Sequence, residues 1–168
     1  NKHVIDEIIA RNQGLYAMVI HMGNWEFLCH TSSVQYSEVH VVTKDVTSGK
    51  VGDWVSNLRK KIGYSLVDRK GASKATHQIF RAIEFKHIVG FIIDQKRPGS
   101  EKIPLFGVPA STSSSLAKLY FKKPAPLLPV IIKRLSPGHF QVKYFDEFIY
   151  ERDPNLSIAE NAHEFGVK

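Results

Sequence analysis

Apolar positions in the first quarter of the chain follow first helical and then strand spacing. Residues 4–9 repeat isoleucine and valine every three to four positions, which predicts a helix that ends at Asn12-Gln13-Gly14. The apolar run at residues 15–20 has the length of a buried strand. From Trp25 to about Tyr36 the pattern favours a second helix, and residues 38–43 are rich in branched side chains, as in a strand.

The same alternation continues through the middle of the chain. Residues 54–62 have helical spacing, and residues 65–67 form a short strand candidate that ends at Asp68-Arg69-Lys70-Gly71. Ser73 is a candidate cap for a helix through Phe85. The apolar run 87–93 then predicts a buried strand that ends at Asp94.

Proline and glycine dominate the next segment. Residues 95–110 are predicted to be a loop, with breakers at Pro98, Gly99, Pro104, Gly107 and Pro109. A Ser/Thr cluster at residues 111–115 precedes a helix from about Ser113 to Lys122 and is expected to cap it. Residues 127–135 and 139–148 predict two strands joined at Ser136-Pro137-Gly138, a hairpin.

Strands that alternate with helices indicate an α/β fold with a mostly parallel mixed sheet flanked by helices. The late hairpin adds an antiparallel edge near the C-terminus. The 168 residues suit a single domain, residues 1–168. Ligands of such folds gather beyond the carboxyl ends of the strands, where His21 and Asp94 are expected to lie.

Composition narrows the chemistry only slightly. The formal net charge of +7 favours an anionic partner, which can be nucleic acid, an anionic membrane surface or a phosphorylated substrate. No window holds the roughly 20 apolar residues that a membrane-spanning helix needs. The one cysteine, Cys29, excludes an intrachain disulfide and a thiolate metal cluster, and it is expected to be a small buried core residue.

His21 and Glu26 are the candidate catalytic pair, although their spacing alone is weak evidence. With 8 histidines and 16 acidic residues, about one such pair arises by chance, and His40 with Asp45 has the same spacing. His40 lies in an apolar strand pattern and is expected to pack or to face an edge. The first pair differs because Gly23-Asn24 can turn the backbone between strand and helix, so that Glu26 can orient His21 as a general base.

Two blocks of residues resemble one known family. The run His21-Met22-Gly23-Asn24-Trp25-Glu26 is similar to the signature of the bacterial lipid A biosynthesis acyltransferases, the late acyltransferases. A second block, in matching order and spacing, comprises Asp94-Gln95, residues 103–112, residues 116–119 and Pro129-Val130-Ile131. Members of this family carry an N-terminal membrane anchor, so we expect residues 1–168 to be the catalytic domain of a longer chain.

The resemblance implies transfer of a fatty acyl group from an acyl carrier protein or coenzyme A thioester to a hydroxyl of a lipid A precursor. His21 and Glu26 would be catalytic, and no metal or other cofactor is expected. Asn24, Arg59, Asp94 and Gln95 would bind substrate, with Arg59 paired to a phosphate or else on a solvated helix face. Trp25 would either wall the pocket or pack in the core.

The expected location is the cytoplasmic face of the inner membrane, where the positive charge would meet anionic lipid. A glycerolipid or lysophospholipid acyltransferase is the alternative within the same reaction class. A basic nucleic-acid-binding module is a distant alternative, based on lysines interleaved with aromatic residues near 120–123 and 143–145. The leading interpretation expects no nucleic-acid partner.

Overall fold

The computed structural model describes residues 1–43, 49–68, 71–96 and 100–168. These residues form two compact units, one of Asn1–Ile92 with Ala125–Phe148 and the other of Ile93–Pro124 with Ile149–Lys168. The assignment of residues 1–168 to a single domain stays a prediction.

The first unit is a layered α/β structure. Its strands are β1 (Leu15–Val19), β2 (Val39–Thr43), β3 (Tyr64–Asp68), β4 (Ile88–Ile92), β7 (Leu127–Ser136) and β8 (His139–Tyr144). Its helices are α1 (Lys2–Ala10), α2 (Trp25–Gln35), α3 (Gly49–Lys61) and α4 (Ala72–Glu84).

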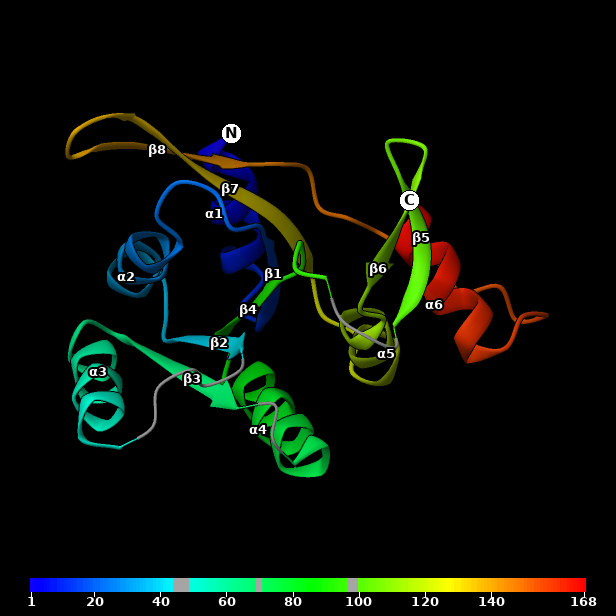
Figure 1. Ribbon diagram of the computed structural model, residues 1–168, viewed down its shortest axis with the longest axis horizontal. Coiled ribbons are helices and arrows are strands. Elements are labelled where there is room, and N and C mark those ends of the chain that lie inside the picture. Colours follow the sequence, from blue (N-terminus) through cyan, green and yellow to red (C-terminus); the bar gives the residue numbers. More distant parts are fainter. Residues whose placement is uncertain (44–48, 69–70, 97–99) are drawn as a thin grey trace. The chain divides into compact units, whose positions relative to one another are not determined.

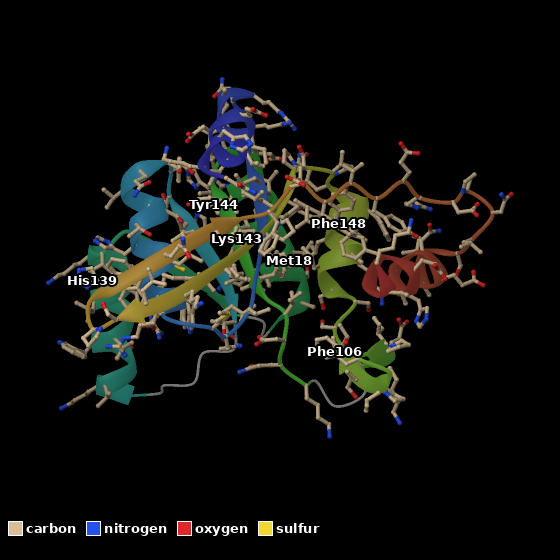
Figure 2. All side chains as sticks on the ribbon, turned by 90° about the horizontal axis from the view of Figure 1, so that it is seen from above. Met18, Phe106, His139, Lys143, Tyr144 and Phe148 are labelled. Carbon is tan, nitrogen blue, oxygen red and sulfur yellow. The ribbon has the colours of Figure 1, made fainter. Side chains whose placement is uncertain are left out.

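The described strands of this unit form one sheet in the order β3-β2-β4-β1-β7-β8. All neighbours are parallel except β7 and β8, which are antiparallel. The predicted α/β class with a mostly parallel sheet and a late antiparallel hairpin is therefore confirmed. In Figure 2, His139 lies at the turn of this hairpin and Tyr144 lies at the far end of β8.

Helices cover both faces of the sheet. Ile5 and Ile8 of α1 and Leu28 and Cys29 of α2 share one buried cluster with every second residue of β1. The other face carries Tyr16 and Phe91, whose rings meet edge to face, and α4 packs on β3 and β4 (Figure 1). A strand buried on both faces is a continuous apolar run, which is why β1 and β4 were evident in the sequence.

The second unit contains a hairpin where a loop was predicted. Strand β5 (Glu101–Leu105) pairs antiparallel with β6 (Val108–Thr112). Pro104 lies opposite Pro109, one pair beyond the residues that flank the two-residue turn. Pairs alternate in an antiparallel ladder, and this one is not hydrogen-bonded, so neither proline removes a ladder bond. The turn at Phe106-Gly107 has positive φ at both residues, the geometry that a two-residue hairpin needs. Figure 2 labels Phe106, whose side chain is 97% exposed.

Two helices complete this unit, α5 (Ser115–Lys122) and α6 (Ile158–Val167). The sequence interpretation did not include α6, although Ser157 and Glu160 form a capping box at its start. Aromatic rings of both helices and of Tyr150 form the packing between them, including Phe121 and Phe165. Asn161 is fully buried and its amide donates to three backbone carbonyls, so its burial is compensated.

Two predicted helix caps were wrong in detail. Helix α4 follows Gly71 and begins at Ala72, so Ser73 lies inside its first turn. Ser111 and Thr112 belong to β6, and Ser114, the N-cap of α5, makes no capping bond with its side chain. The Oγ of Ser113 instead accepts a hydrogen bond from the backbone N–H of Ser115.

None of the helices in the described ranges is long and apolar enough to cross a membrane.

The turn between β1 and α2 approaches β7 so closely that it requires glycine. Gly23 has a φ of +63°, and a Cβ at this position would overlap the backbone carbonyl of Ile132. Gly138, in the β7–β8 turn, also has a positive φ of +75°, but its Cβ would meet nothing within 4 Å. Substitutions at these two glycines therefore distinguish the energetic cost of the left-handed backbone conformation from the cost of the steric overlap.

We expect Gly23→Ala to lower the free energy of unfolding by roughly 3 kcal/mol. The left-handed conformation and the overlap with Ile132 both disfavour alanine at this position in the folded protein. The matched control, Gly138→Ala, should cost only about 1 kcal/mol because it meets the conformational penalty alone. Urea denaturation followed by circular dichroism measures both. Equal losses in the two variants would contradict the close contact.

Candidate functional site

The loop at the carboxyl end of β1 carries the predicted catalytic histidine. Strand β1 ends at Val19, and the N–H of Met22 donates to the carbonyl of Ile20 in a tight turn. His21 lies in this turn and is exposed. The predicted position of His21 after a buried strand is confirmed.

Helix α2 begins directly after this turn, as predicted from Gly23 and Asn24. Asn24 is its N-cap, and the Asn24 side-chain oxygen accepts a hydrogen bond from the N–H of Phe27 at 3.0 Å. This bond fixes the start of the helix and places Glu26 in its first turn. Capping is thus the contact that the structure gives Asn24, while its substrate-binding role stays a prediction.

Glu26 forms an ion pair with Arg59 of α3. Arg59 donates to the same carboxylate oxygen, Oε1, from Nη2 at 2.6 Å and from Nε at 3.1 Å. The Arg59 side chain is 19% exposed and that of Glu26 is 44% exposed, so the pair lies at the boundary between core and solvent. The structure therefore brings together two of the predicted site residues, and Arg59 does not lie on a freely solvated helix face.

Tyr64, the first residue of β3, completes this network. The Arg59 Nε also donates to the Tyr64 hydroxyl at 3.2 Å. Burial raises the pKa of Tyr64 to about 12, with the negative charge of Glu26 adding to the effect, so the phenol stays neutral. Burial by itself would lower the pKa of Arg59, but the bonds to Glu26 and Tyr64 outweigh it and raise that pKa. The guanidinium is therefore a permanent positive charge beside Glu26.

The core beneath this network is inert. Cys29 is buried, as predicted, and burial together with the nearby charge of Glu26 raises its pKa to about 12. A protonated, inaccessible thiol is a poor nucleophile. Trp25 packs against the core cluster and meets Tyr64 edge to face with ring centroids 6.4 Å apart, which agrees with core packing.

The remaining predicted residues divide between the two units. Asp94 and Gln95 follow β4, are exposed and belong to the second unit. His40 lies in β2, which is between β3 and β4, so it is not on an edge strand. Its ring is partly buried and stacks on that of His87. Its proposed partner by spacing, Asp45, lies outside the described residues. The contact between His21 and Glu26 and the roles of Asp94 and Gln95 stay predictions.

Tyr64 was missed by the sequence interpretation. It follows Arg59 by five positions, but the chain reverses between α3 and β3, so neither helical nor strand periodicity links the two residues. The available signal was a tyrosine beginning a buried strand, since a buried tyrosine hydroxyl usually has a hydrogen-bond partner.

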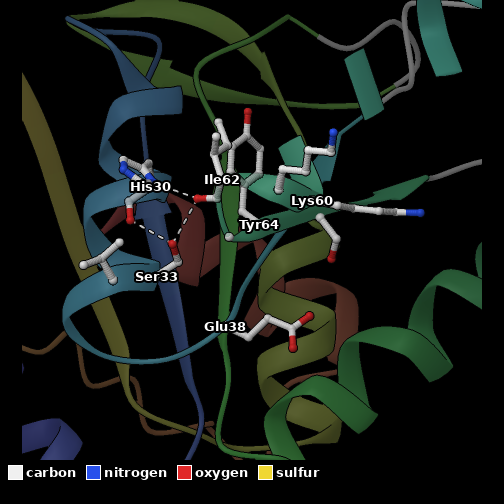
Figure 3. Close-up of a pocket in the computed structure, with 10 residues that line it drawn as sticks. His30, Ser33, Glu38, Lys60, Ile62 and Tyr64 are labelled. Atoms are coloured by element: carbon white, nitrogen blue, oxygen red, sulfur yellow. Dashed lines mark hydrogen bonds between the residues drawn. The ribbon is translucent and has the colours of Figure 1, made fainter. Parts of the chain in front are cut away.

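A separate pocket of about 580 Å³ opens beside α2 and β3 (Figure 3). His30 Nδ1 donates to the carbonyl of Ile62 at 2.7 Å, and Ser33 Oγ donates to the carbonyl of His30 at 2.8 Å. Glu38, Lys60 and Tyr64 also line it. These bonds hold α2 against the turn that leads into β3.

Comparison with known protein families gives a match over nearly the whole chain. The model of one family, described as bacterial lipid A biosynthesis acyltransferase, matches residues 1–161. No curated protein matches the chain. The matched range includes the β1–α2 turn, the Glu26–Arg59 pair and the residues of the second sequence block. This chain therefore belongs to the bacterial lipid A biosynthesis acyltransferase family.

Proposed function

We propose that this lipid A acyltransferase moves a fatty acyl group from an acyl carrier protein or coenzyme A thioester to a hydroxyl of a lipid A precursor. His21 is the general base and Glu26 is the residue that orients it. The observation that carries the proposal is a carboxylate fixed by Arg59 in the first turn of α2, directly after the exposed histidine. No metal or cofactor is needed for attack on a thioester.

The chemistry follows from the acid–base properties of these groups. A ring nitrogen of His21 takes the proton of the acceptor hydroxyl while the hydroxyl oxygen attacks the thioester carbonyl. The carbon–sulfur bond then breaks, an ester forms, and the imidazolium returns the proton to the leaving thiolate. The first two N–H groups of α2, those of Trp25 and Glu26, precede the N–H that Asn24 caps and are suited to hold the oxyanion that forms between these steps.

Arg59 acts on Glu26 in this proposal. Arg59 donates from Nε and Nη2 to one carboxylate oxygen, and these two bonds fix the Glu26 carboxylate. Other N–H groups of the guanidinium can bind a substrate phosphate, so the substrate-binding role of Arg59 stays a prediction. We propose that Asn24 contacts the substrate and that Asp94 and Gln95 bind a substrate hydroxyl.

We expect His21→Ala to lower kcat/KM at least about 100-fold with an unchanged circular dichroism spectrum, because the general base is lost. His139→Ala, which removes an exposed imidazole from the β7–β8 turn, is the matched control and should keep full activity. The assay follows thiol release with a lipid A precursor as the acceptor. Undiminished turnover by the His21 variant, or a preference for lysophospholipid acceptors in a side-by-side panel, would overturn the corresponding part of the proposal.

Arg59→Lys should lower kcat roughly tenfold to hundredfold and leave KM nearly unchanged, because lysine cannot give two fixed bonds to Glu26 Oε1. Arg11→Lys is the control, since Arg11 also pairs with a glutamate, Glu147, at 2.6 Å. Steady-state kinetics separate the two roles of Arg59. A raised KM with normal kcat would mean that Arg59 binds the substrate phosphate instead.

Helix α3 presents an apolar stripe that suits a peripheral position on the cytoplasmic face of the inner membrane. Val51, Trp54 and Leu58 are 67%, 65% and 43% exposed, and their spacing of three and four places them on one side of the helix. Exposed lysines lie at both ends of the helix, at position 50 and at positions 60 and 61. Tryptophan between basic residues is typical of helices that lie in the interface of an anionic bilayer.

Trp54→Ser should weaken binding to vesicles that contain phosphatidylglycerol by roughly tenfold, because the variant loses a large apolar side chain that the bilayer would bury. The control, Leu135→Ser, removes another apolar side chain, 59% exposed, from the β7–β8 hairpin. Co-sedimentation at two salt concentrations measures both. If the two variants bind alike, α3 is not the membrane contact.

A further inference from the structure

Two histidines and a glutamate meet at the amino ends of neighbouring strands. Glu38 immediately precedes β2, His40 lies within it and His87 immediately precedes β4. The β2–β4 pairing begins at Val39 and Ile88, and the N–H of Ile88 donates to the carbonyl of Glu38 at 3.0 Å. The register of the paired strands therefore brings the three residues together.

The ligand-type atoms of these residues are close together. His40 Nε2 lies 3.0 Å from His87 Nδ1. Glu38 Oε1 lies 3.5 Å from His40 Nε2, and Glu38 Oε2 lies 3.9 Å from His87 Nδ1. Nitrogen and oxygen ligands about 2.0–2.1 Å from a tetrahedral zinc ion are about 3.4 Å apart, so the three distances span the value that a shared ion would impose.

We propose that Glu38, His40 and His87 form a binding site for a divalent transition-metal cation such as Zn²⁺. The two imidazoles are partly buried, with side chains 18% and 25% exposed, whereas Glu38 is 55% exposed. Three protein ligands leave a fourth position for water. This site does not involve the substrates of the acyl transfer, so the metal-binding proposal is independent of the proposed function.

The surroundings of His40 suit a metal ligand. Ser65 Oγ lies 2.9 Å from His40 Nδ1 and fixes the ring from the side opposite Nε2. A hydrogen bond on the second ring nitrogen is the usual support of a metal-bound histidine. To bind a cation, His40 would carry its one proton on Nδ1, where it donates to Ser65 Oγ, and His87 would carry its proton on Nε2. The lone pairs of His40 Nε2 and His87 Nδ1, which lie 3.0 Å apart, then both face the ion.

An ion can reach these atoms from solvent. His40 and His87 line a pocket of about 440 Å³, and Glu38 lines the 580 Å³ pocket shown in Figure 3. Ser65 and Lys60 belong to both linings, so the cluster lies where the two pockets adjoin. Because β2 and β4 are joined here by residues distant in sequence, a bound cation would also stabilise the folded sheet.

Isothermal titration of the chelator-treated full chain with ZnCl₂ tests the site. We expect one Zn²⁺ per chain, and Glu38→Gln and His87→Gln should each weaken binding by at least about tenfold. Glu38→Gln is the safer variant because this exposed side chain is not needed for the core. His163→Gln is the matched control: His163 Nδ1 lies 3.6 Å from Glu101 Oε2 without a second histidine, and this variant should bind as the unmodified chain does.

Thermal unfolding gives a second, independent measurement. At free Zn²⁺ about 100-fold above Kd, the equilibrium constant for unfolding should fall about 100-fold, and the shift should vanish in Glu38→Gln. Ser65→Ala should weaken binding about tenfold by releasing the His40 ring. Absence of saturable binding, or equal binding by Glu38→Gln and the unmodified chain, would overturn the site and leave a hydrogen-bonded histidine pair.

Discussion

The burial of β1 on both faces is the constraint on which this structure depends. Its partners β4 and β7 lie far away in sequence, and its alternate residues pack against α1 and α2 on one side while Tyr16 meets Phe91 on the other. A strand enclosed in this way can expose polar side chains only beyond its ends. The chain leaves β1 at a turn that presses Gly23 against β7, and this turn carries His21. The position of the candidate base is therefore a consequence of packing.

The Glu26–Arg59–Tyr64 network stabilises a carboxylate that the same packing brings to the rim of the core. Helix α2 must bury Leu28 and Cys29, which brings Glu26 to the rim of the core. A carboxylate at such a boundary is stabilised by a fixed positive charge, and Arg59 supplies one that cannot be removed by pH within the ordinary range. The neutral Tyr64 hydroxyl shares the Nε hydrogen of Arg59 with Glu26 and so helps to orient the guanidinium.

The sequence predicted those features that depend on local pattern. Continuous apolar runs located β1 and β4, and the turn residues Gly23-Asn24 located the start of α2. Features that depend on tertiary pairing were missed. The β5–β6 hairpin contains prolines, which suggest a loop unless the pairing of the two strands is known. Tyr64 contacts Arg59 only because the chain reverses between α3 and β3. Glu38 and His40 are two positions apart, but their meeting with His87 follows from the strand order, which puts β4 beside β2.

The two ends of this parallel sheet offer different chemistry for a general reason. At the carboxyl end of β1 the chain turns into α2, and N–H groups at the start of a helix favour anionic groups and developing negative charge. At the amino ends of β2 and β4 the chain arrives from α2 and α4, and the residues just before each strand are brought together by the parallel register. Glu38, His40 and His87 offer a carboxylate and two imidazole rings at that end, the ligand types that divalent transition metals prefer. The proposed acyl-transfer site and the proposed metal site therefore lie at opposite ends of one sheet and share no residue.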